Sequence, residues 1–505
     1  MNSNNQLKAG AVLNYVVIIL NTLVGLLYTP YMLRMMGQNE FGLYSLVSSV
    51  IAYLTILDLG FGNAIIRYTA KFRAENRVRE QYEMFGMFLI LYLIIGIVSF
   101  LIGLVLYFNV DSIFSSSMLP DQIIKARKMI LLMVFNVAFT FPMSIYGSII
   151  NAYEHFVFPR ALNVIRILLN TIIMIVLLSY GYKALAIIVL QTIFNVVTLI
   201  LNWIYCKCKL QVKVVFSKFN WAFLKEVAIY SFWIFLFVIM DRIYWGTGQF
   251  VLGAIVGTAA VAVYAVAIQL QNMYMQFSNA IASLLLPKVT VMVASNNNKA
   301  ISDLFIRTGR LQYVILAYIL TGFLCFGNQF IQLWAGPEYC DAFIISVLFF
   351  LPLTVPLIQN VGISILQARN QMEFRSILYI CIAIISLILQ IILAQKIGAI
   401  GCAIAVSGAL IVGQIFIMNI YYAKKQHIDI LFFWKEILRM SIIPILVGCI
   451  TFLGTHYYTI DSWGKLLLCI VLFSLFYIPL FFVFSLNTYE KNLFITPLKK
   501  LCEKC

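Results

Sequence analysis

Residues 84–108 read MFGMFLILYLIIGIVSFLIGLVLYF, a run of 25 residues without a charged side chain. An apolar helix of about 20 residues is long enough to cross the hydrocarbon core of a bilayer. Comparable apolar blocks recur along the whole chain, with short polar stretches between them. This pattern predicts an all-α polytopic membrane protein, because a helix satisfies its own backbone hydrogen bonds in lipid.

The composition of the whole chain agrees with this interpretation. Of the 505 residues, 63% are apolar and 11% are charged, whereas soluble domains have about 45–50% and about 25%. A soluble globular protein is therefore excluded. The net charge of +16 does not indicate a nucleic-acid partner, because the basic residues lie between the apolar blocks. The first block lacks a small-residue cleavage pattern, so we expect a retained span and not a signal peptide.

Fourteen apolar blocks are long enough to span a membrane, and the connections between them are too short to hold a soluble domain. The predicted spans are residues 12–34, 41–66, 84–108, 128–150, 160–180, 184–206, 226–252, 258–286, 311–330, 342–367, 374–395, 399–422, 437–455 and 464–486. If the amino terminus is cytosolic, 26 of the 35 basic residues lie on the inner side and 7 on the outer side. Both termini are therefore predicted to be cytosolic.

A weak internal repeat indicates how the spans are grouped. Gly37 and Tyr44 recur as Gly257 and Tyr264 at the same offset of 220 residues. Equal numbers of spans on either side favour two parallel six-helix bundles, as in transporters with parallel repeats. The predicted parts are an amino-terminal bundle, a carboxy-terminal bundle, and two additional transmembrane helices with a cytosolic tail, covering residues 1–215, 216–425 and 426–505.

Several spans carry amide side chains at helical spacing, so that they share one face of the helix. The amides and the basic residue that we take as lining a polar cavity are Asn21, Asn163, Arg166, Asn170, Asn195, Gln269, Asn272 and Gln276. The alternative is that these groups make hydrogen bonds between helices in a dry core. The amides on one helix face favour a water-filled cavity, because amide side chains do not stabilise a helix face that contacts lipid.

Two ionisable residues lie near the middle of a predicted span, Asp241 and Arg242. A charge at that depth is costly, so each needs a partner or water. Arg166 lies less deep, and its alternative role is to extend to the cytosolic surface. We take Arg166 and Arg242 as candidates for binding an anionic substrate, because guanidinium pairs well with phosphate. Asp241 is the candidate for coupling transport to protons or a cation.

The chain offers no reacting constellation of the kind an enzyme needs. Its three histidines lie outside the predicted spans, and the glycines of residues 60–62 lie within one, with no strand before them. There is also no phosphate-binding loop of the nucleotide-hydrolysing type. A membrane glycosyltransferase or polymerase would need a carboxylate-rich external site, which the sequence lacks. We therefore expect no enzyme activity, no cofactor and no bound metal.

The region around the second span contains a recognisable motif. It has Asp58, Gly60 and Arg67 within the segment DLGFGNAIIRY of residues 58–68, after EFGLY at residues 40–44. This pattern resembles the polysaccharide transporter branch of the multidrug/oligosaccharidyl-lipid/polysaccharide exporter superfamily. That branch contains the O-antigen and capsule repeat-unit flippases, and the resemblance covers essentially the whole chain.

The resemblance implies a V-shaped pair of six-helix bundles that opens alternately to the two sides of a bacterial cytoplasmic (inner) membrane. It implies a cargo of undecaprenyl-diphosphate-linked oligosaccharide, used to make the O-antigen of lipopolysaccharide, capsule or exopolysaccharide. A polysaccharide polymerase and glycosyltransferases are further candidate partners, and the chain is expected to be a monomer. The alternative within the superfamily is a multidrug/toxin extrusion cation antiporter.

Overall fold

The computed structural model describes residues 3–216, 221–282, 289, 292–293, 298–369, 371–492 and 495. Every regular element in these residues is a helix, so the predicted all-α class is confirmed. By contact, the chain forms two compact units, Met1–Ala262 and Val263–Cys505.

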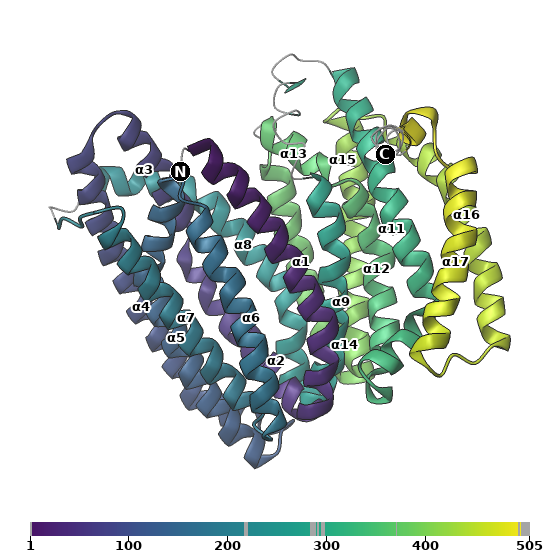
Figure 1. The fold of residues 1–505 in the computed structure, drawn as a ribbon, viewed down its shortest axis with the longest axis horizontal. Helices are drawn as coiled ribbons and strands as arrows, with labels where there is room; N and C mark the ends of the chain where they lie inside the picture. The colour runs from purple at the N-terminus through teal and green to yellow at the C-terminus, as the bar shows by residue number, and fades with distance from the viewer. Residues whose placement is uncertain are drawn as a thin grey trace, which may run out of the picture. The chain divides into compact units, whose positions relative to one another are not determined.

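The first unit is built from long helices that pack side by side. Figure 1 shows α4, α5 and α7 running along one another, and α1 against α6. Its helices are α1 (Ser3–Met36), α2 (Gln38–Leu54), α3 (Phe61–Ala74), α4 (Val78–Phe114), α5 (Pro120–Ala152), α6 (Val157–Ser179), α7 (Ala184–Cys208) and α8 (Trp221–Ile255). Helix α9 (Thr258–Ala282) begins in this unit and continues into the second.

The second predicted span, residues 41–66, is not one continuous helix. Helix α2 ends at Leu54, and a short 3-10 helix, η1 (Thr55–Asp58), follows. Leu59 (φ 53°) and Gly60 (φ 73°) then adopt left-handed conformations, and α3 starts again at Phe61. Two consecutive left-handed residues end any right-handed helix, and glycine adopts this conformation without a Cβ penalty. The prediction of an unbroken helix here was wrong.

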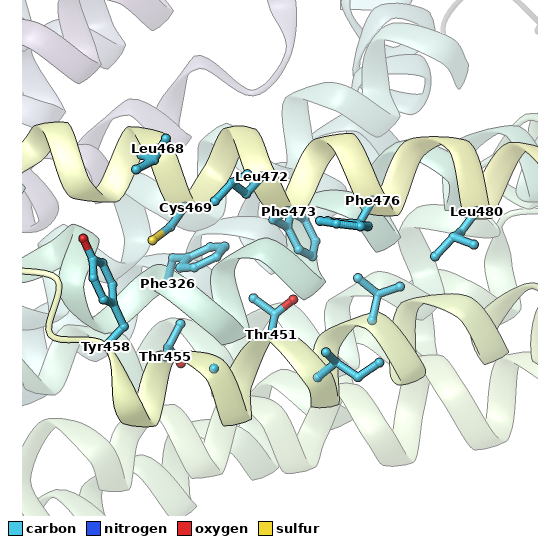
Figure 2. Close-up of a pocket in the computed structure, with 13 residues that line it drawn as sticks. Phe326, Thr451, Thr455, Tyr458, Leu468, Cys469, Leu472, Phe473, Phe476 and Leu480 are labelled. Carbon is cyan, nitrogen blue, oxygen red and sulfur yellow. The ribbon is translucent and has the colours of Figure 1, made fainter.

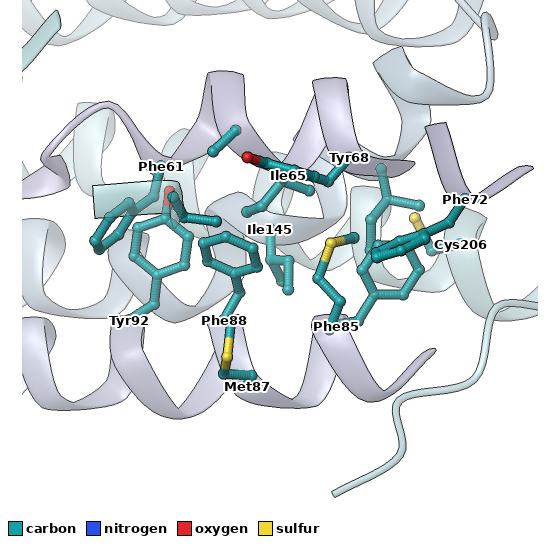
Figure 3. Close-up of a cluster of buried hydrophobic side chains, with 14 of the residues drawn as sticks. Phe61, Ile65, Tyr68, Phe72, Phe85, Met87, Phe88, Tyr92, Ile145 and Cys206 are labelled. Atoms are coloured by element: carbon teal, nitrogen blue, oxygen red, sulfur yellow. The ribbon is translucent and has the colours of Figure 1, made fainter. Parts of the chain in front are cut away.

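A hydrophobic cluster holds the restarted helix α3 in place (Figure 3). The ring of Phe61 lies 5.7 Å from that of Phe88 and 6.2 Å from that of Tyr92, both edge to face. Ala64 and Ile65 on the same helix are fully buried. Aromatic pairs of this geometry stabilise beyond their buried area. The cluster therefore fixes the position of the broken segment against α4 and α5.

The second unit contains a helix that reverses direction and a carboxy-terminal hairpin. Its described helices are α11 (Asn298–Trp334), α12 (Asp341–Ile358), α13 (Val361–Ala368), α14 (Glu373–Leu410), the π-helix η3 (Ile411–Ile417), α15 (Met418–Lys424), α16 (Ile430–Tyr457) and α17 (Trp463–Phe484). Inside α14, Ile397 and Gly398 leave the helical conformation, with Gly398 at φ 59°. This break lies between two predicted spans. Helices α16 and α17 pack against each other and against α11 (Figure 1).

Eleven helices among the described residues are long and apolar enough to cross a membrane. One of them, Glu373–Lys424, contains the break at Gly398. The exact number of fourteen spans stays a prediction. The predicted division at residues 215 and 425 also stays a prediction; by contact, α8 packs with α2 and α3 in the first unit.

The two glycines of the predicted repeat have the same structural role. Gly37 (φ 77°) lies between α1 and α2, and Gly257 (φ 123°) lies just before α9. A positive φ is strained for residues with a side chain. Each glycine therefore allows two long helices to be joined by a very short turn.

Candidate functional site

A polar cavity of about 580 Å³ lies within the first unit, between η1, α5, α6 and α7. Its volume is within the range of small-molecule sites. Four amides line it, together with three hydroxyl groups, two phenylalanine rings, one acid and one base. These are Asn136, Asn170, Gln191, Asn195; Thr55, Thr140, Ser144; Phe141, Phe194; Asp58 and Arg166, with Val137 beside them.

Helical periodicity brings these side chains to one place. On α5, Asn136, Thr140 and Ser144 follow each other at four-residue spacing. Arg166 and Asn170 on α6 have the same spacing. Residues four apart lie on one face of a helix, so each helix presents a polar face to the cavity.

Part of the polar lining is already joined by hydrogen bonds. The Asn195 Nδ2 group donates to Asn136 Oδ1 at 2.6 Å and to Thr140 Oγ1 at 2.8 Å. The Gln191 Nε2 group donates to the hydroxyl of Tyr44 at 2.8 Å. The Oδ1 atom of Asn170 is buried and has no hydrogen-bond partner among the described residues. The cavity therefore retains free acceptors next to groups that are held in place.

The two charged residues of the cavity differ in their surroundings. The Tyr92 hydroxyl donates a hydrogen bond to Asp58 Oδ1 at 2.9 Å, so the carboxylate is anchored from α4. The Arg166 side chain is exposed at the cavity. Within the described part of the chain, no ion pair or hydrogen bond is made by Arg166. Its guanidinium is thus free to bind an anionic group.

The structure brings together some of the predicted cavity residues and leaves others outside. Arg166, Asn170 and Asn195 line the same cavity. Asn21 on α1 is exposed and Asn163 on α6 is half-buried, and neither lines it.

Asp241 and Arg242 are both exposed on α8. They form no ion pair with each other or with another described residue. The expectation that each faces water or its own partner stays a prediction.

The predicted amides of α9 lie in the second unit. Asn272 and Gln276 are exposed there, whereas Gln269 is half-buried and makes an interaction. One turn further along α9, the Asn360 Nδ2 group donates to Asn279 Oδ1 at 2.8 Å. Asn279 belongs to the same polar stripe of α9 as the predicted amides, and in the structure it is paired with Asn360.

The motif residues around the helix break have structural roles. Gly60 provides the left-handed turn, and Asp58 accepts the bond from Tyr92. Arg67 is exposed, and its guanidinium carbon lies 5.8 Å from the centre of the Tyr68 ring. The motif therefore builds one wall of the cavity and the core beneath it.

Sequence reasoning missed the contribution of α5 and η1 to the cavity. Asn136, Thr140 and Ser144 form a polar stripe at four-residue spacing, which is the signal already used for the other spans. Thr55 had no such signal, because its position depends on the break of the helix after Leu54.

A second hollow, in the second unit, has a different character. A groove of about 500 Å³ lies between α11, α16 and α17. Figure 2 shows Phe326, Leu472, Phe473 and Phe476 among the side chains that line it. Thr451, Thr455 and Tyr458 are its polar members, and no charged residue lines it. A charged or hydroxyl-rich ligand has too few partners there. The polar cavity of the first unit is therefore the better candidate site.

Comparison with known proteins identifies the family. A family model described as polysaccharide biosynthesis protein matches residues 7–293. The chain belongs to this polysaccharide biosynthesis family. The matched region includes the motif around Asp58 and all residues that line the polar cavity. No curated protein matches the chain closely enough to be counted as a relative.

Solved structures with the same fold include a flippase and transporters of the MATE family. A lipid II flippase, MurJ, in an inward closed conformation has a TM-score of 0.69 at 17% identity, covering 93% of this chain and 99% of MurJ. An inward-facing multidrug resistance MATE family transporter of the MOP superfamily has a TM-score of 0.60 at 16% identity, covering 80% and 99%. The Vibrio cholerae MATE transporter VcmN in its bent form has a TM-score of 0.52 at 14% identity, covering 88% and 99%.

These comparisons confirm the resemblance to the polysaccharide transporter branch of the superfamily. This polysaccharide biosynthesis family member is a multi-pass membrane protein that shares the fold of MurJ. The solved structures compared above are named as a flippase and as multidrug transporters.

Proposed function

We propose that this protein is a flippase for undecaprenyl-diphosphate-linked oligosaccharide repeat units. It moves the polar head group across the bacterial cytoplasmic (inner) membrane by alternating access, for O-antigen, capsule or exopolysaccharide synthesis. The observation that carries the proposal is the polar cavity of the first unit, where Arg166 lies among amides and hydroxyls and has no partner among the described residues. Membership of the polysaccharide biosynthesis family and the fold shared with a lipid II flippase support it.

In this proposal Arg166 and Arg242 bind anionic groups of the head group, with the diphosphate as the expected partner. The remaining proposed contacts are Asn163, Asn170, Asn21, Asn195, Gln269, Asn272 and Gln276. A guanidinium pairs with phosphate through two parallel hydrogen bonds, and it is less strongly hydrated than an ammonium group. The lipid tail remains in the bilayer while the head group crosses, and both termini stay in the cytosol.

A complementation assay for surface polysaccharide tests the proposal. We expect Arg166→Ala and Arg242→Ala to abolish surface polysaccharide in a flippase-deficient host while protein levels hold. Arg160→Ala is the matched control, since Arg160 is an exposed residue at the start of α6 that does not line the cavity. Wild-type output from both Arg166→Ala and Arg242→Ala would contradict the proposal.

Asp241 is the proposed residue for coupling to protons or sodium, because a carboxyl group at mid-span is able to bind either. We expect transport by Asp241→Asn to lose its dependence on an imposed ion gradient. An unchanged gradient dependence removes this part of the proposal.

The second candidate function is a multidrug/toxin extrusion cation antiporter, which the fold shared with MATE transporters favours. Efflux of a cationic dye from whole cells separates the two functions. An antiporter lowers dye accumulation, and a lipid-linked oligosaccharide flippase leaves it unchanged.

A further inference from the structure

The charges of the polar cavity limit what it can hold. It is lined by one base, Arg166, and one acid, Asp58, so its formal charge is zero when both are ionised. A diphosphate by itself carries at least two negative charges and needs more than one cation when it is removed from water. One guanidinium suits a ligand that presents one anionic group at this point.

The uncharged lining suits a ring that carries hydroxyl groups. Asn195 uses its Nδ2 group within the wall, and in the part of the chain that the structure describes neither Asn195 Oδ1 nor Asn136 Nδ2 makes a hydrogen bond. The Oδ1 atom of Asn170 is buried without a partner among the described residues. A ligand hydroxyl is both donor and acceptor, so it satisfies such a mixed set of amides. The rings of Phe141 and Phe194 add apolar faces.

The wall is also rigid enough to select a ligand. Asn195 is held by both Asn136 and Thr140, which lie on a neighbouring helix. Asp58 is held by Tyr92, and the helix break that carries it is anchored by the core around Phe61. Groups fixed by their own hydrogen bonds lose little entropy when a ligand binds. A ligand without hydroxyl groups leaves the amides of the wall unpaired. The site therefore discriminates against such ligands.

We infer that this cavity is a glycosyl subsite, which binds the first sugar of the head group together with one anionic group beside it. Asn136, Asn170 and Asn195 contact the sugar hydroxyls, and Arg166 contacts the anion. The anion is either the phosphate that carries the sugar or a carboxylate on the sugar ring. This inference rests on the proposed function and adds which part of the head group the first unit holds.

Thermal stabilisation of the purified full-length protein in detergent tests the inference. The probes are glucose 1-phosphate, galactose 1-phosphate and N-acetylglucosamine 1-phosphate for the phosphate source, and glucuronate for the carboxylate source. Glucose tests binding of the sugar alone, and inorganic pyrophosphate tests binding of the phosphate alone. We expect a sugar phosphate or glucuronate to stabilise the protein at lower concentration than glucose or pyrophosphate does.

Variants then assign the binding to the cavity. Arg166→Gln and Asn195→Ala should each weaken binding about tenfold or more, as expected for a lost hydrogen bond to a charged or buried polar group. Arg160→Gln on the same helix and Asn109→Ala, an exposed amide on α4, are the matched controls and should bind as the wild type does. Size-exclusion profiles show whether each variant is folded.

Two results overturn the inference. The first is that the folded wild type is stabilised neither by any of the three sugar phosphates nor by glucuronate. The second is that pyrophosphate binds as well as the sugar phosphates do and keeps its affinity in Asn195→Ala. Flipping of lipid-linked oligosaccharide in proteoliposomes is measured separately. If flipping persists while the sugar ligands fail, only the subsite is wrong, and if flipping is absent, the proposed function is wrong.

Discussion

At the scale of single residues, Gly60 is the position where the local conformation most directly sets up the candidate site. Its φ of 73° ends the short helix that carries Asp58 and lets α3 restart toward the core. A residue with a Cβ in this conformation costs about 1–2 kcal/mol. The sequence marked Gly60 as part of a motif, but the break itself was not predicted, because the apolar pattern continues across it without interruption.

Gly60→Ala is therefore expected to lower the free energy of unfolding by about 1–2 kcal/mol. The control is Gly408→Ala, at a helical position in α14 where an added Cβ meets no atom within 4 Å. That change should raise stability by about 0.5–1 kcal/mol, because alanine loses less backbone entropy on folding. Apparent melting temperatures in detergent measure both. If Gly60→Ala is as stable as the wild type, the strain argument fails.

His155 gives a prediction of pH dependence. It lies between α5 and α6, with its Nδ1 atom 2.8 Å from the Tyr205 hydroxyl. Burial, and then the neighbouring Arg73 and Lys209, lower the pKa of His155 below its ordinary value. In the unfolded chain His155 binds a proton below about pH 6.5, whereas in the folded chain it binds the proton only at a lower pH. This contribution to stability is therefore present at neutral pH and is lost as the pH falls through that range.

The melting temperature of the wild type should fall between pH 7 and pH 5 more steeply than that of His155→Gln. The control is His427→Asn, which changes an exposed histidine and should keep the slope of the wild type. Equal slopes for the wild type and His155→Gln would show that His155 does not titrate differently on folding.

At the scale of elements, the hairpin of α16 and α17 is tied to α11 by a buried ion cluster. The Arg310 Nε atom donates to Glu490 Oε1 at 2.6 Å, and Nη2 donates to Glu490 Oε2 at 2.8 Å and to the Ser485 carbonyl at 3.2 Å. Glu436 on α16 also pairs with Arg310. The side chains of Arg310 and Glu490 are 4% and 1% exposed. The sequence placed Arg310 among the cytosolic charges and gave no sign of this pairing, since Glu490 is 180 residues away.

Arg310→Ala should destabilise the protein by about 3–5 kcal/mol, because two glutamates lose their partner and one of them is fully buried. Arg439→Ala, an exposed position on α16, is the control and should change stability little. The double variant Arg310→Met with Glu490→Leu should be more stable than Arg310→Ala, because it removes the buried charge as well as its partner. A loss for Arg310→Ala no larger than for Arg439→Ala would contradict this account.

The sequence pattern predicted part of the cavity lining and not the rest. The stripe of Arg166 and Asn170 marked one wall of the cavity, because helical periodicity is a local property. The same reasoning placed Asn21 and Asn163 there, and the structure leaves both outside the cavity. Which face of a helix meets which neighbour depends on contacts between distant helices, and spacing along one helix does not contain them.

At the scale of the whole molecule, the apolar blocks predicted the class of fold, since bilayer thickness sets the length of a span. They did not reveal that a span is broken by Leu59 and Gly60, or that long helices such as α4 extend well past the predicted span. Residues at helix ends are polar for reasons other than the membrane boundary. The sequence pattern therefore does not identify both the membrane boundary and the residue at which the helix ends.

The topology is a separate prediction that reporter fusions test. A reporter after His427 should face the cytosol, and a reporter after Asp461 should face outward, because basic residues are concentrated on the predicted inner side. Green fluorescent protein is fluorescent only inside, and alkaline phosphatase is active only outside. The reverse pattern at these two positions would overturn the predicted topology and the cytosolic termini.

Flippase activity is measured directly with purified protein in proteoliposomes that carry an undecaprenyl-diphosphate-linked oligosaccharide in one leaflet. Its appearance in the other leaflet is followed with a membrane-impermeant glycosidase. We expect rapid translocation by the wild type and by Arg160→Gln, and translocation at least about tenfold slower by Arg166→Gln. Translocation by Arg166→Gln at the wild-type rate, or by the wild type no faster than in empty liposomes, would contradict this expectation.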